Sequence, residues 1–111
     1  MDIHYDKKKI KKYCEIFKEA SRQYGTDIAR KINQWISELA AFENLDEVVS
    51  TYFKGCHLLK GNRKGCYAVD LNNQYRIVFK PYIEDLSLNL DDISMEDIKV
   101  IIIKEICDYH D

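Results

Sequence analysis

Apolar residues recur three or four positions apart through the first third of the chain, which is the spacing of one helix face. Between the Lys-rich stretch at 7–12 and Gly25 they are Ile10, Tyr13, Cys14, Phe17, Ala20 and Tyr24. Beyond Thr26 and Asp27, either of which can cap a helix start, they are Ile28, Ile32, Trp35, Ile36, Leu39 and Phe42. The pattern predicts two helices, joined so closely that they form an antiparallel hairpin whose apolar faces need a sheet to cover them.

The pattern then changes to short β-prone runs bounded by turn residues. Strands are predicted at residues 2–5, 57–59, 65–71, 74–80 and 99–107. Asn72 and Asn73 suit a two-residue hairpin turn because Asn tolerates positive φ, and Pro81 ends the strand that follows this turn. The last run is almost continuously apolar, with Val100, Ile101, Ile102, Ile103 and Ile106. Such a run predicts a central strand that is covered, at least in part, on both faces.

These elements predict one α+β domain over residues 1–111, in which an N-terminal two-helix hairpin packs on a curved antiparallel β-sheet. A chain of 111 residues, 46% hydrophobic and 32% charged, is typical of a single globular domain. No run of about 20 apolar residues is present, and no apolar segment follows the Lys-rich N-terminus as it would in a signal peptide. We therefore expect a cytoplasmic protein that does not enter a membrane.

Charge is unevenly distributed, although the net charge of the whole chain is only −2. Residues 54–80 hold one acid, Asp70, and six bases, which are Lys54, Lys60, Arg63, Lys64, Arg76 and Lys80. Residues 81–98 hold six acids and no base. Local field governs a bound phosphate more than total charge does. The basic region is therefore a candidate nucleic-acid surface, despite a sequence pI of about 5.9.

The four cysteines are scattered and form no Cys-x-x-Cys pair, which disfavours a zinc ribbon or a thioredoxin-like site. In a cytoplasmic protein we expect them to be reduced and partly buried. A metal site would have to gather its ligands from distant segments, at Cys56, His57, Cys66, Cys107 and His110. Metal ligands normally come in tighter local pairs, so we expect neither a metal nor another cofactor.

Side chains suited to phosphate chemistry stand in two separate parts of the chain. His57 and Lys60 are close enough along a strand to lie within reach of one another. Arg76 stands mid-strand between apolar neighbours, where a cation needs an open cleft or a partner. If the last strand pairs with residues 74–80, its end carries to the same rim Asp108, Tyr109 and His110.

Two of these residues suit proton transfer in RNA cleavage by the neighbouring ribose 2′-hydroxyl. The reaction needs a base for the hydroxyl proton, an acid for the leaving 5′ oxygen, and cations for the charge that grows on phosphorus. His57 and His110 are the candidate base and acid, because imidazole titrates near neutrality. The reaction needs no metal.

The other candidates would bind the phosphate and the RNA. Lys60 and Arg76 would neutralise the phosphorane. Tyr109 would stack on a base or donate a hydrogen bond, and Asp108 would orient Arg76 or the neighbouring histidine. The remaining cations of the basic region are the expected RNA contacts, at Lys54, Arg63, Lys64 and Lys80.

Three spaced blocks of these residues resemble a known protein family. The blocks are His57-x-x-Lys60-Gly61-Asn62-Arg63-Lys64-Gly65, Tyr75-Arg76-Ile77-Val78-Phe79 and Asp108-Tyr109-His110. In this order they resemble the HigB-like branch of the RelE/ParE superfamily, the toxins of bacterial type II toxin-antitoxin modules, over most of the chain. The resemblance implies a RelE-like fold and a toxin that cuts mRNA in the A site of the ribosome. It implies catalytic residues at the positions of His57, Lys60, Arg76, Asp108, Tyr109 and His110.

The resemblance also implies a protein partner. This partner is a HigA-like antitoxin with a helix-turn-helix, and the complex of toxin and antitoxin represses its own operon, so that operator DNA is contacted through the antitoxin. The chain departs from the compact members of the family in its acidic segment at 81–98, and its pI is low where such toxins are commonly basic. Charge is relevant because affinity for rRNA rests heavily on phosphate neutralisation.

A second class of function is open on the sequence alone, that of a binding protein. The chain would then be a ParE-like gyrase poison, or an inactive toxin homologue that binds an antitoxin and tunes transcription. The paired histidines favour the nuclease, since a poison that works by binding has no use for proton transfer. The acidic segment favours the second class. His57 as an ordinary surface residue and 108–111 as a frayed tail are the structural alternatives, while Arg76 is hardest to explain without a function.

Overall fold

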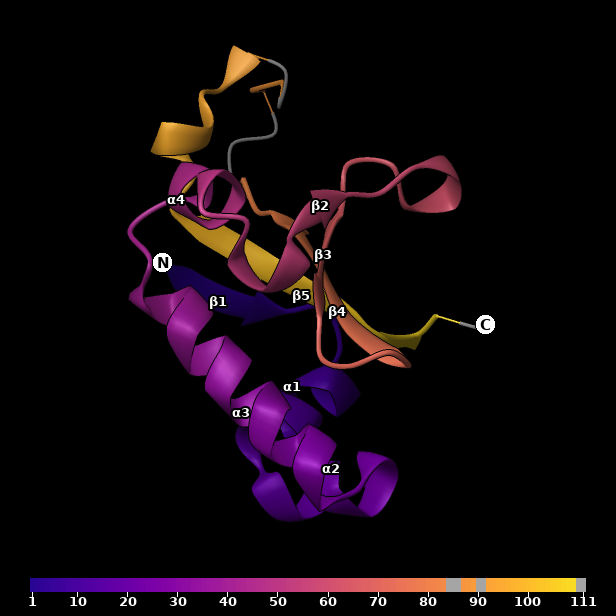
Figure 1. Ribbon diagram of the computed structural model, residues 1–111. Coiled ribbons are helices and arrows are strands. Elements are labelled where there is room, and N and C mark those ends of the chain that lie inside the picture. The colour runs from indigo at the N-terminus through magenta and orange to yellow at the C-terminus, as the bar shows by residue number, and fades with distance from the viewer. Residues whose placement is uncertain (84–86, 90–91, 110–111) are drawn as a thin grey trace.

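The computed structural model describes residues 1–83, 87–89 and 92–109 (Figure 1). Its elements are β1 (Asp2–Tyr5), α1 (Lys8–Glu15), α2 (Phe17–Tyr24), α3 (Thr26–Ala41), α4 (Leu45–Ser50), β2 (His57–Leu58), β3 (Tyr67–Asp70), β4 (Tyr75–Pro81) and β5 (Val100–Asp108). Short 3₁₀ turns occupy Phe53–Gly55, Gly61–Arg63 and Met95–Asp97. Helices α1 to α3 gather on one side of the strands (Figure 1), so the predicted α+β class is confirmed.

The described strands form one sheet in the order β1-β5-β4-β3-β2. The predicted central position of the last strand is confirmed, since β5 lies between β1 and β4. Strands β2 to β5 pair antiparallel with their neighbours, whereas β1 pairs parallel to β5, with Ile3 opposite Ile101. The sheet is therefore mixed rather than wholly antiparallel. Helices α1 to α4 and strands β2 to β4 lie between β1 and β5 along the chain, and a connection this long permits parallel pairing.

The first predicted helix is divided in two at Ile16. The backbone of Ile16 is extended, with φ −114° and ψ 102°, and it ends α1 and precedes α2. Apolar spacing continues across this residue, so periodicity alone predicts a single helix. Gly25, with a φ of +90° that suits glycine, links α2 to α3 in the expected hairpin. No helix within the described residues is long and apolar enough to cross a bilayer.

Helix α4 is an addition that the apolar pattern does not predict. The side-chain oxygen of Asn44 accepts a hydrogen bond from the Glu47 backbone N–H at 3.0 Å. The Glu47 side chain in turn accepts one from the backbone N–H of Glu43 at 3.2 Å. These two bonds satisfy backbone donors at the start of the helix, in the manner of a capping box.

The turn between β3 and β4 differs from the predicted two-residue hairpin. The Leu71 N–H donates to the Tyr75 carbonyl at 2.9 Å, which leaves three residues in the loop. The Asn72 side-chain oxygen accepts hydrogen bonds from the N–H groups of Gln74 and Tyr75 at 2.9 and 2.6 Å. Neither Asn72 nor Asn73 has positive φ. Asn72 therefore closes the turn with its side chain, and the expected left-handed backbone is not needed.

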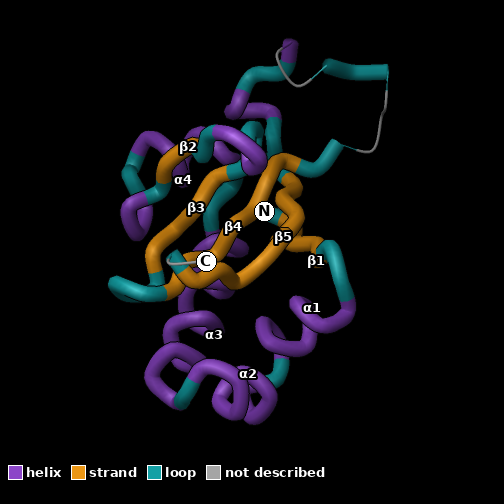
Figure 2. Tube along the Cα trace, turned by 90° about the vertical axis from the view of Figure 1, so that its right-hand side faces the viewer, coloured by secondary structure: helices purple, strands orange, loops and turns teal. Residues whose placement is uncertain are grey.

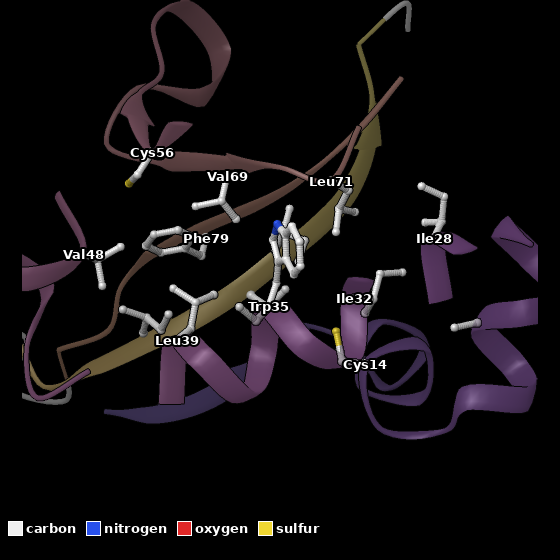
Figure 3. Close-up of a cluster of buried hydrophobic side chains, with 14 of the residues drawn as sticks. Cys14, Ile28, Ile32, Trp35, Leu39, Val48, Cys56, Val69, Leu71 and Phe79 are labelled. Atoms are coloured by element: carbon white, nitrogen blue, oxygen red, sulfur yellow. The ribbon is translucent and has the colours of Figure 1, made fainter. Parts of the chain in front are cut away.

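A single large core lies between the helices and one face of the sheet. Trp35 and Leu39 point from α3 toward the strands that carry Val69 and Phe79 (Figure 3). Leu39, Val69 and Phe79 have no exposed surface. The Trp35 Nε1–H donates to the backbone carbonyl of Asp70 at 2.7 Å, which ties α3 to the end of β3. Helices α1 to α3 thus cover one face of the sheet and not the other (Figure 1).

Candidate active site

Alternate residues of β4 point to opposite faces of the sheet. Ile77 and Phe79 belong to the core under the helices. On the other face Val78 packs in a small separate cluster with Leu59, Ala68, Cys107 and the partly buried Cys66. Arg76 precedes Ile77 along β4, so its side chain points to the same face of the sheet as that of Val78. We call the face that carries Arg76 and Val78 the open face. Residues 61–66 and the end of β5 both project on the side of the molecule that faces the viewer in Figure 2.

Pairing of β4 with β5 brings Arg76 to the residues that follow the last strand, as the sequence predicts. Arg76 lies opposite Cys107, and the backbone N–H of Tyr109 donates to the Gln74 carbonyl at 2.7 Å. The Arg76 guanidinium carbon stands 4.7 Å from the centre of the Tyr109 ring. The Gln74 side-chain amide donates to Asp108 Oδ2 at 3.0 Å. Arg76 and Tyr109 therefore meet at one end of the open face. Asp108 does not join them, because it lies opposite Tyr75, which packs against the main core, and it contacts Gln74 at the strand end.

Asp70 joins this group, although the sequence gives it no role. It ends β3 directly opposite Arg76. Asp70 Oδ1 and Arg76 Nε are both buried, and neither has a hydrogen-bond partner among the described residues. Desolvation raises the pKa of the Asp70 carboxyl, while the positive charges of His57 and Arg76 act to lower it. The available signal in the sequence is that Asp70 is the lone acid within residues 54–80.

His57 reaches the same group from the edge strand β2. It pairs with Ala68 of β3, two residues from Asp70, and its ring is exposed. The ring Nδ1 lies 2.9 Å from the carbonyl oxygen of Gly55. Because a carbonyl only accepts hydrogen bonds, Nδ1 carries the proton in this contact and Nε2 of the neutral ring is an open acceptor. His57 is therefore held in one tautomer, within electrostatic reach of Asp70.

Lys60 is not brought into the group around Arg76. It is exposed and begins a loop that is closed by a 2.8 Å hydrogen bond from the Leu59 N–H to the Cys66 carbonyl. The strand registers place Lys60 and Tyr109 toward opposite ends of the open face. His110 lies outside the described residues.

Two of the four expected RNA contacts have partners within the protein. Arg63 forms an ion pair and hydrogen bond with Glu105, and its Nη2 donates to Cys107 Sγ at 3.5 Å. The hydrogen bond to Glu105 is the main cause of the raised pKa of Arg63. The Lys54 Nζ stands 4.2 Å above the Trp35 ring. The other two cations are an exposed and a half-buried lysine, Lys64 and Lys80.

The cysteines are free thiols, and Cys14, Cys56 and Cys107 are buried. Burial raises the pKa of Cys14 to about 12 and that of Cys56 to about 11. Both are therefore protonated at neutral pH and pack as small apolar groups. Within residues 1–83, 87–89 and 92–109, no three His, Cys, Asp or Glu side chains lie close enough together to hold a metal ion.

Comparison with solved structures identifies the fold. No protein-family model matches the sequence, and no curated protein sequence does. A YoeB/ParE toxin from Agrobacterium tumefaciens is 13% identical, with a TM-score of 0.56 over 98% of this chain and 99% of its own. The toxin fold in the YoeB-YefM complex from Staphylococcus aureus matches with a TM-score of 0.56 at 19% identity, over 100% and 98% of the two chains. This chain has the fold of the YoeB toxins.

The YoeB neighbours support the fold, which is a coarser result than the HigB-like branch that the sequence blocks suggest. The YoeB dimer from Staphylococcus aureus gives the same TM-score of 0.56 at 19% identity. These similar structures are described as YoeB or YoeB/ParE toxins, and the narrower HigB-like assignment is not confirmed. At this level of identity the likeness to YoeB establishes the fold alone.

Proposed function

We propose that this chain is the toxin of a type II toxin-antitoxin module and that it cleaves mRNA on the ribosome. The observation that supports this most is the state of Arg76. Its guanidinium stacks on Tyr109 at the end of the open face, and its buried Nε has no acceptor among the described residues. A guanidinium fork with uncommitted donors suits phosphate oxygens. The YoeB fold and the resemblance of the three sequence blocks agree with this proposal.

In the proposed reaction His57 acts as the general base. With Nδ1–H donated to Gly55, its Nε2 can take the proton of the attacking ribose 2′-hydroxyl. Arg76 then offsets the charge that grows on the phosphorane. Lys60, toward the other end of the face, would bind a phosphate further along the RNA. His110 is the proposed acid for the leaving 5′ oxygen.

Two further residues would hold the RNA in place. Tyr109 offers a ring on which a splayed base can stack, while its other face steadies Arg76. Asp108 accepts a hydrogen bond from Gln74, which fixes the end of β5 beside β4. The RNA backbone would pass over Lys54, Arg63, Lys64 and Lys80. The reaction uses no metal.

The proposed partner is an antitoxin encoded beside the toxin. One neighbour in fold is described as a heterotetrameric YoeB-YefM toxin-antitoxin complex, and the sequence blocks suggest a HigA-like protein with a helix-turn-helix. Through this antitoxin the pair would bind operator DNA. Co-expression with a small helix-turn-helix protein from the adjacent gene is expected to restore growth to cells that make the toxin.

The proposed activity is tested by the substitution Arg76→Gln. We expect cleavage of mRNA on programmed ribosomes to fall about 10²- to 10³-fold, the usual effect of removing one transition-state donor. Arg30→Gln is the matched control, because it removes the same group from an exposed position on α3, where the side chain is 68% exposed. Induction in bacteria, followed by mapping of new 5′ mRNA ends, gives the in-cell measurement. An Arg76→Gln protein that is folded and cleaves at the wild-type rate would show the assignment to be wrong.

A gyrase poison is the competing function, and the description of the Agrobacterium neighbour as a YoeB/ParE toxin favours keeping it in the test. Under that function, induction leaves mRNA intact and blocks DNA replication. New ends within codons near translation starts would instead support the nuclease. If neither mRNA cleavage nor a replication block occurs and an antitoxin still binds, the chain is an inactive homologue.

A further inference from the structure

Asp70 is a partly buried acid that has no role in the proposed reaction. It lies on β3, between Arg76 on β4 and the segment that leads into β2. Its Oδ1 is buried without a hydrogen-bond partner among the described residues. A buried carboxylate oxygen without a donor costs free energy, and polar atoms left in this state are concentrated at functional sites.

Gly55 is shaped to admit the Asp70 carboxylate. A Cβ added at Gly55 would stand 2.7 Å from Asp70 Oδ2, closer than such atoms can approach. The φ of Gly55 is +71°, in the left-handed region that favours glycine. The same residue supplies the carbonyl oxygen that fixes the His57 ring. One glycine thus supports both the carboxylate and the imidazole.

We propose that Asp70 is a positioning residue for the cleavage reaction, acting on Arg76 through its charge from the opposite strand and balancing the positive charge that His57 gains with the 2′-hydroxyl proton. This inference rests on the proposed function and concerns the same site. In that step the O2′–H bond breaks and its proton goes to His57 Nε2. The O2′–P bond then forms, the P–O5′ bond breaks, and the leaving oxygen takes a proton from the general acid.

The charge balance explains why a carboxylate is placed there. Three ionisable residues are involved: His57, Asp70 and Arg76. Before the reaction the His57 ring is neutral, as a general base must be, so Arg76 is the one cation among the three. After proton transfer there are two cations, His57 and Arg76, which would repel each other if nothing lay between them. Asp70 stands between their strands, and both cations act electrostatically on it. It does not touch the reacting atoms, so its effect reaches them through His57 and Arg76.

The substitution Asp70→Asn keeps the shape and removes the charge. We expect the single-turnover cleavage rate to fall about tenfold, a part of the ~10²- to 10⁴-fold that a general base contributes. Binding of the same mRNA with a 2′-deoxy residue at the cleaved position is expected to stay equal or become tighter, because a negative charge near the phosphate is gone. If Asp70 had a merely structural role, the substitution would lower both the cleavage rate and the affinity for this mRNA.

Thermal stability supplies a readout of opposite sign. The folded-state pKa of Asp70 is raised, first by desolvation, so its ionised form destabilises the fold as pH rises through that pKa. Asp70→Asn is therefore expected to raise the melting temperature at pH 7, and the difference should vanish below about pH 4, where an ordinary Asp is protonated. The charged groups that act on Asp70 are His57 of β2 and Arg76 of β4.

A pair of glycine variants separates backbone strain from the carboxylate. Gly55→Ala and Gly61→Ala both place Ala at a φ near +70°, at +71° and +69°. A Cβ at Gly61 meets no atom within 4 Å, whereas the one at Gly55 displaces Asp70. We expect the two variants to lose similar amounts of stability. A cleavage rate that falls about tenfold further in Gly55→Ala alone would support the proposal. Equal cleavage rates in the two variants would overturn it.

The coupling is also measured without activity, by NMR titration of the Asp70 carboxyl carbon. In His57→Gln and in Arg76→Gln the pKa of Asp70 is expected to rise, because each removes a charge that lowers it. Unchanged pKa values in both variants, in a protein that cleaves mRNA, would remove the role of Asp70 alone. A wild-type protein that cleaves no mRNA would overturn the proposed function and the role of Asp70 with it, even if the pKa rises.

Discussion

The two faces of the sheet use alternate residues of the same strands in opposite ways. Under the helices, Ile77 and Phe79 have no exposed surface and belong to the main core. On the open face, Arg76 and Asp70 keep buried polar atoms without hydrogen-bond partners among the described residues. One face lowers the free energy of the fold by burying apolar surface, whereas the other tolerates unsatisfied charge. Stability and proposed chemistry are therefore separated by a single step along β4.

The comparison also holds for the small apolar cluster on the open face. Its buried members are Leu59, Ala68, Val78 and Cys107. They bury far less apolar material than the core under the helices, and they support the ends of the strands where Arg76 and Tyr109 meet. Substitutions on the two faces should accordingly differ in kind, with unfolding on one side and loss of activity on the other.

The largest effect on stability is expected from Phe79→Ala. Phe79 is fully buried and stacks on Tyr67, with ring centres 5.8 Å apart. We expect a loss of about 3–5 kcal/mol in the free energy of unfolding, measured by urea denaturation. Val78→Ala, one residue earlier on the open face, should cost about 2 kcal/mol, since only two methyl groups are removed. Equal losses would mean that the two faces contribute alike.

Trp35→Phe probes the contact that joins the helices to the end of β3. The substitution keeps an aromatic ring in the core but removes the Nε1–H that donates to the Asp70 carbonyl at 2.7 Å. We expect a loss of about 1–3 kcal/mol, the cost of a buried acceptor left without its donor. Tyr67→Phe is the control, because its hydroxyl makes only a long 3.8 Å contact with Met95 Sδ. A loss no greater than that of the control would contradict the importance of this contact.

The smallest effect is expected on the open face, from Glu105→Gln. Glu105 pairs with Arg63, and their side chains are 39% and 37% exposed. Pairs this exposed to water contribute about 0–1 kcal/mol, so the loss should be small and should shrink in 1 M salt, where the Debye length is about 3 Å. A large loss that is insensitive to salt would show that the open face also contributes strongly to stability.

Much of the sheet could be predicted from the sequence, because strand formation follows local apolar runs. The near-continuous apolar run that forms β5 is the clearest case, because such a run is typical of a central strand covered on both faces. The break at Ile16 could not be predicted, because no Pro or Gly marks it and apolar spacing crosses it. The α4 helix could have been found from Asn44 and Glu47, which stand at capping-box spacing.

The candidate site was predictable where it depends on strand pairing. Arg76 and Tyr109 meet because β4 and β5 pair in the expected way. Asp70 was missed because its role depends on its register opposite Arg76, and that register follows from a three-residue loop. The predicted two-residue turn at Asn72 and Asn73 would instead place Asp70 opposite Tyr75. The position of Lys60 depends on the loop that begins there, which sequence spacing does not determine.

The parallel pairing of β1 with β5 has a consequence for the time at which the protein can fold. β5 follows β1 to β4 along the chain, and β1 and β4 have no common neighbour until it has been synthesised. Contacts between residues so distant in sequence form slowly and late. The sheet, and with it the meeting of Arg76 and Tyr109, cannot be completed while β5 is still missing. For a nuclease proposed to act on ribosomes, the candidate site would therefore stay incomplete while the first four strands are being made.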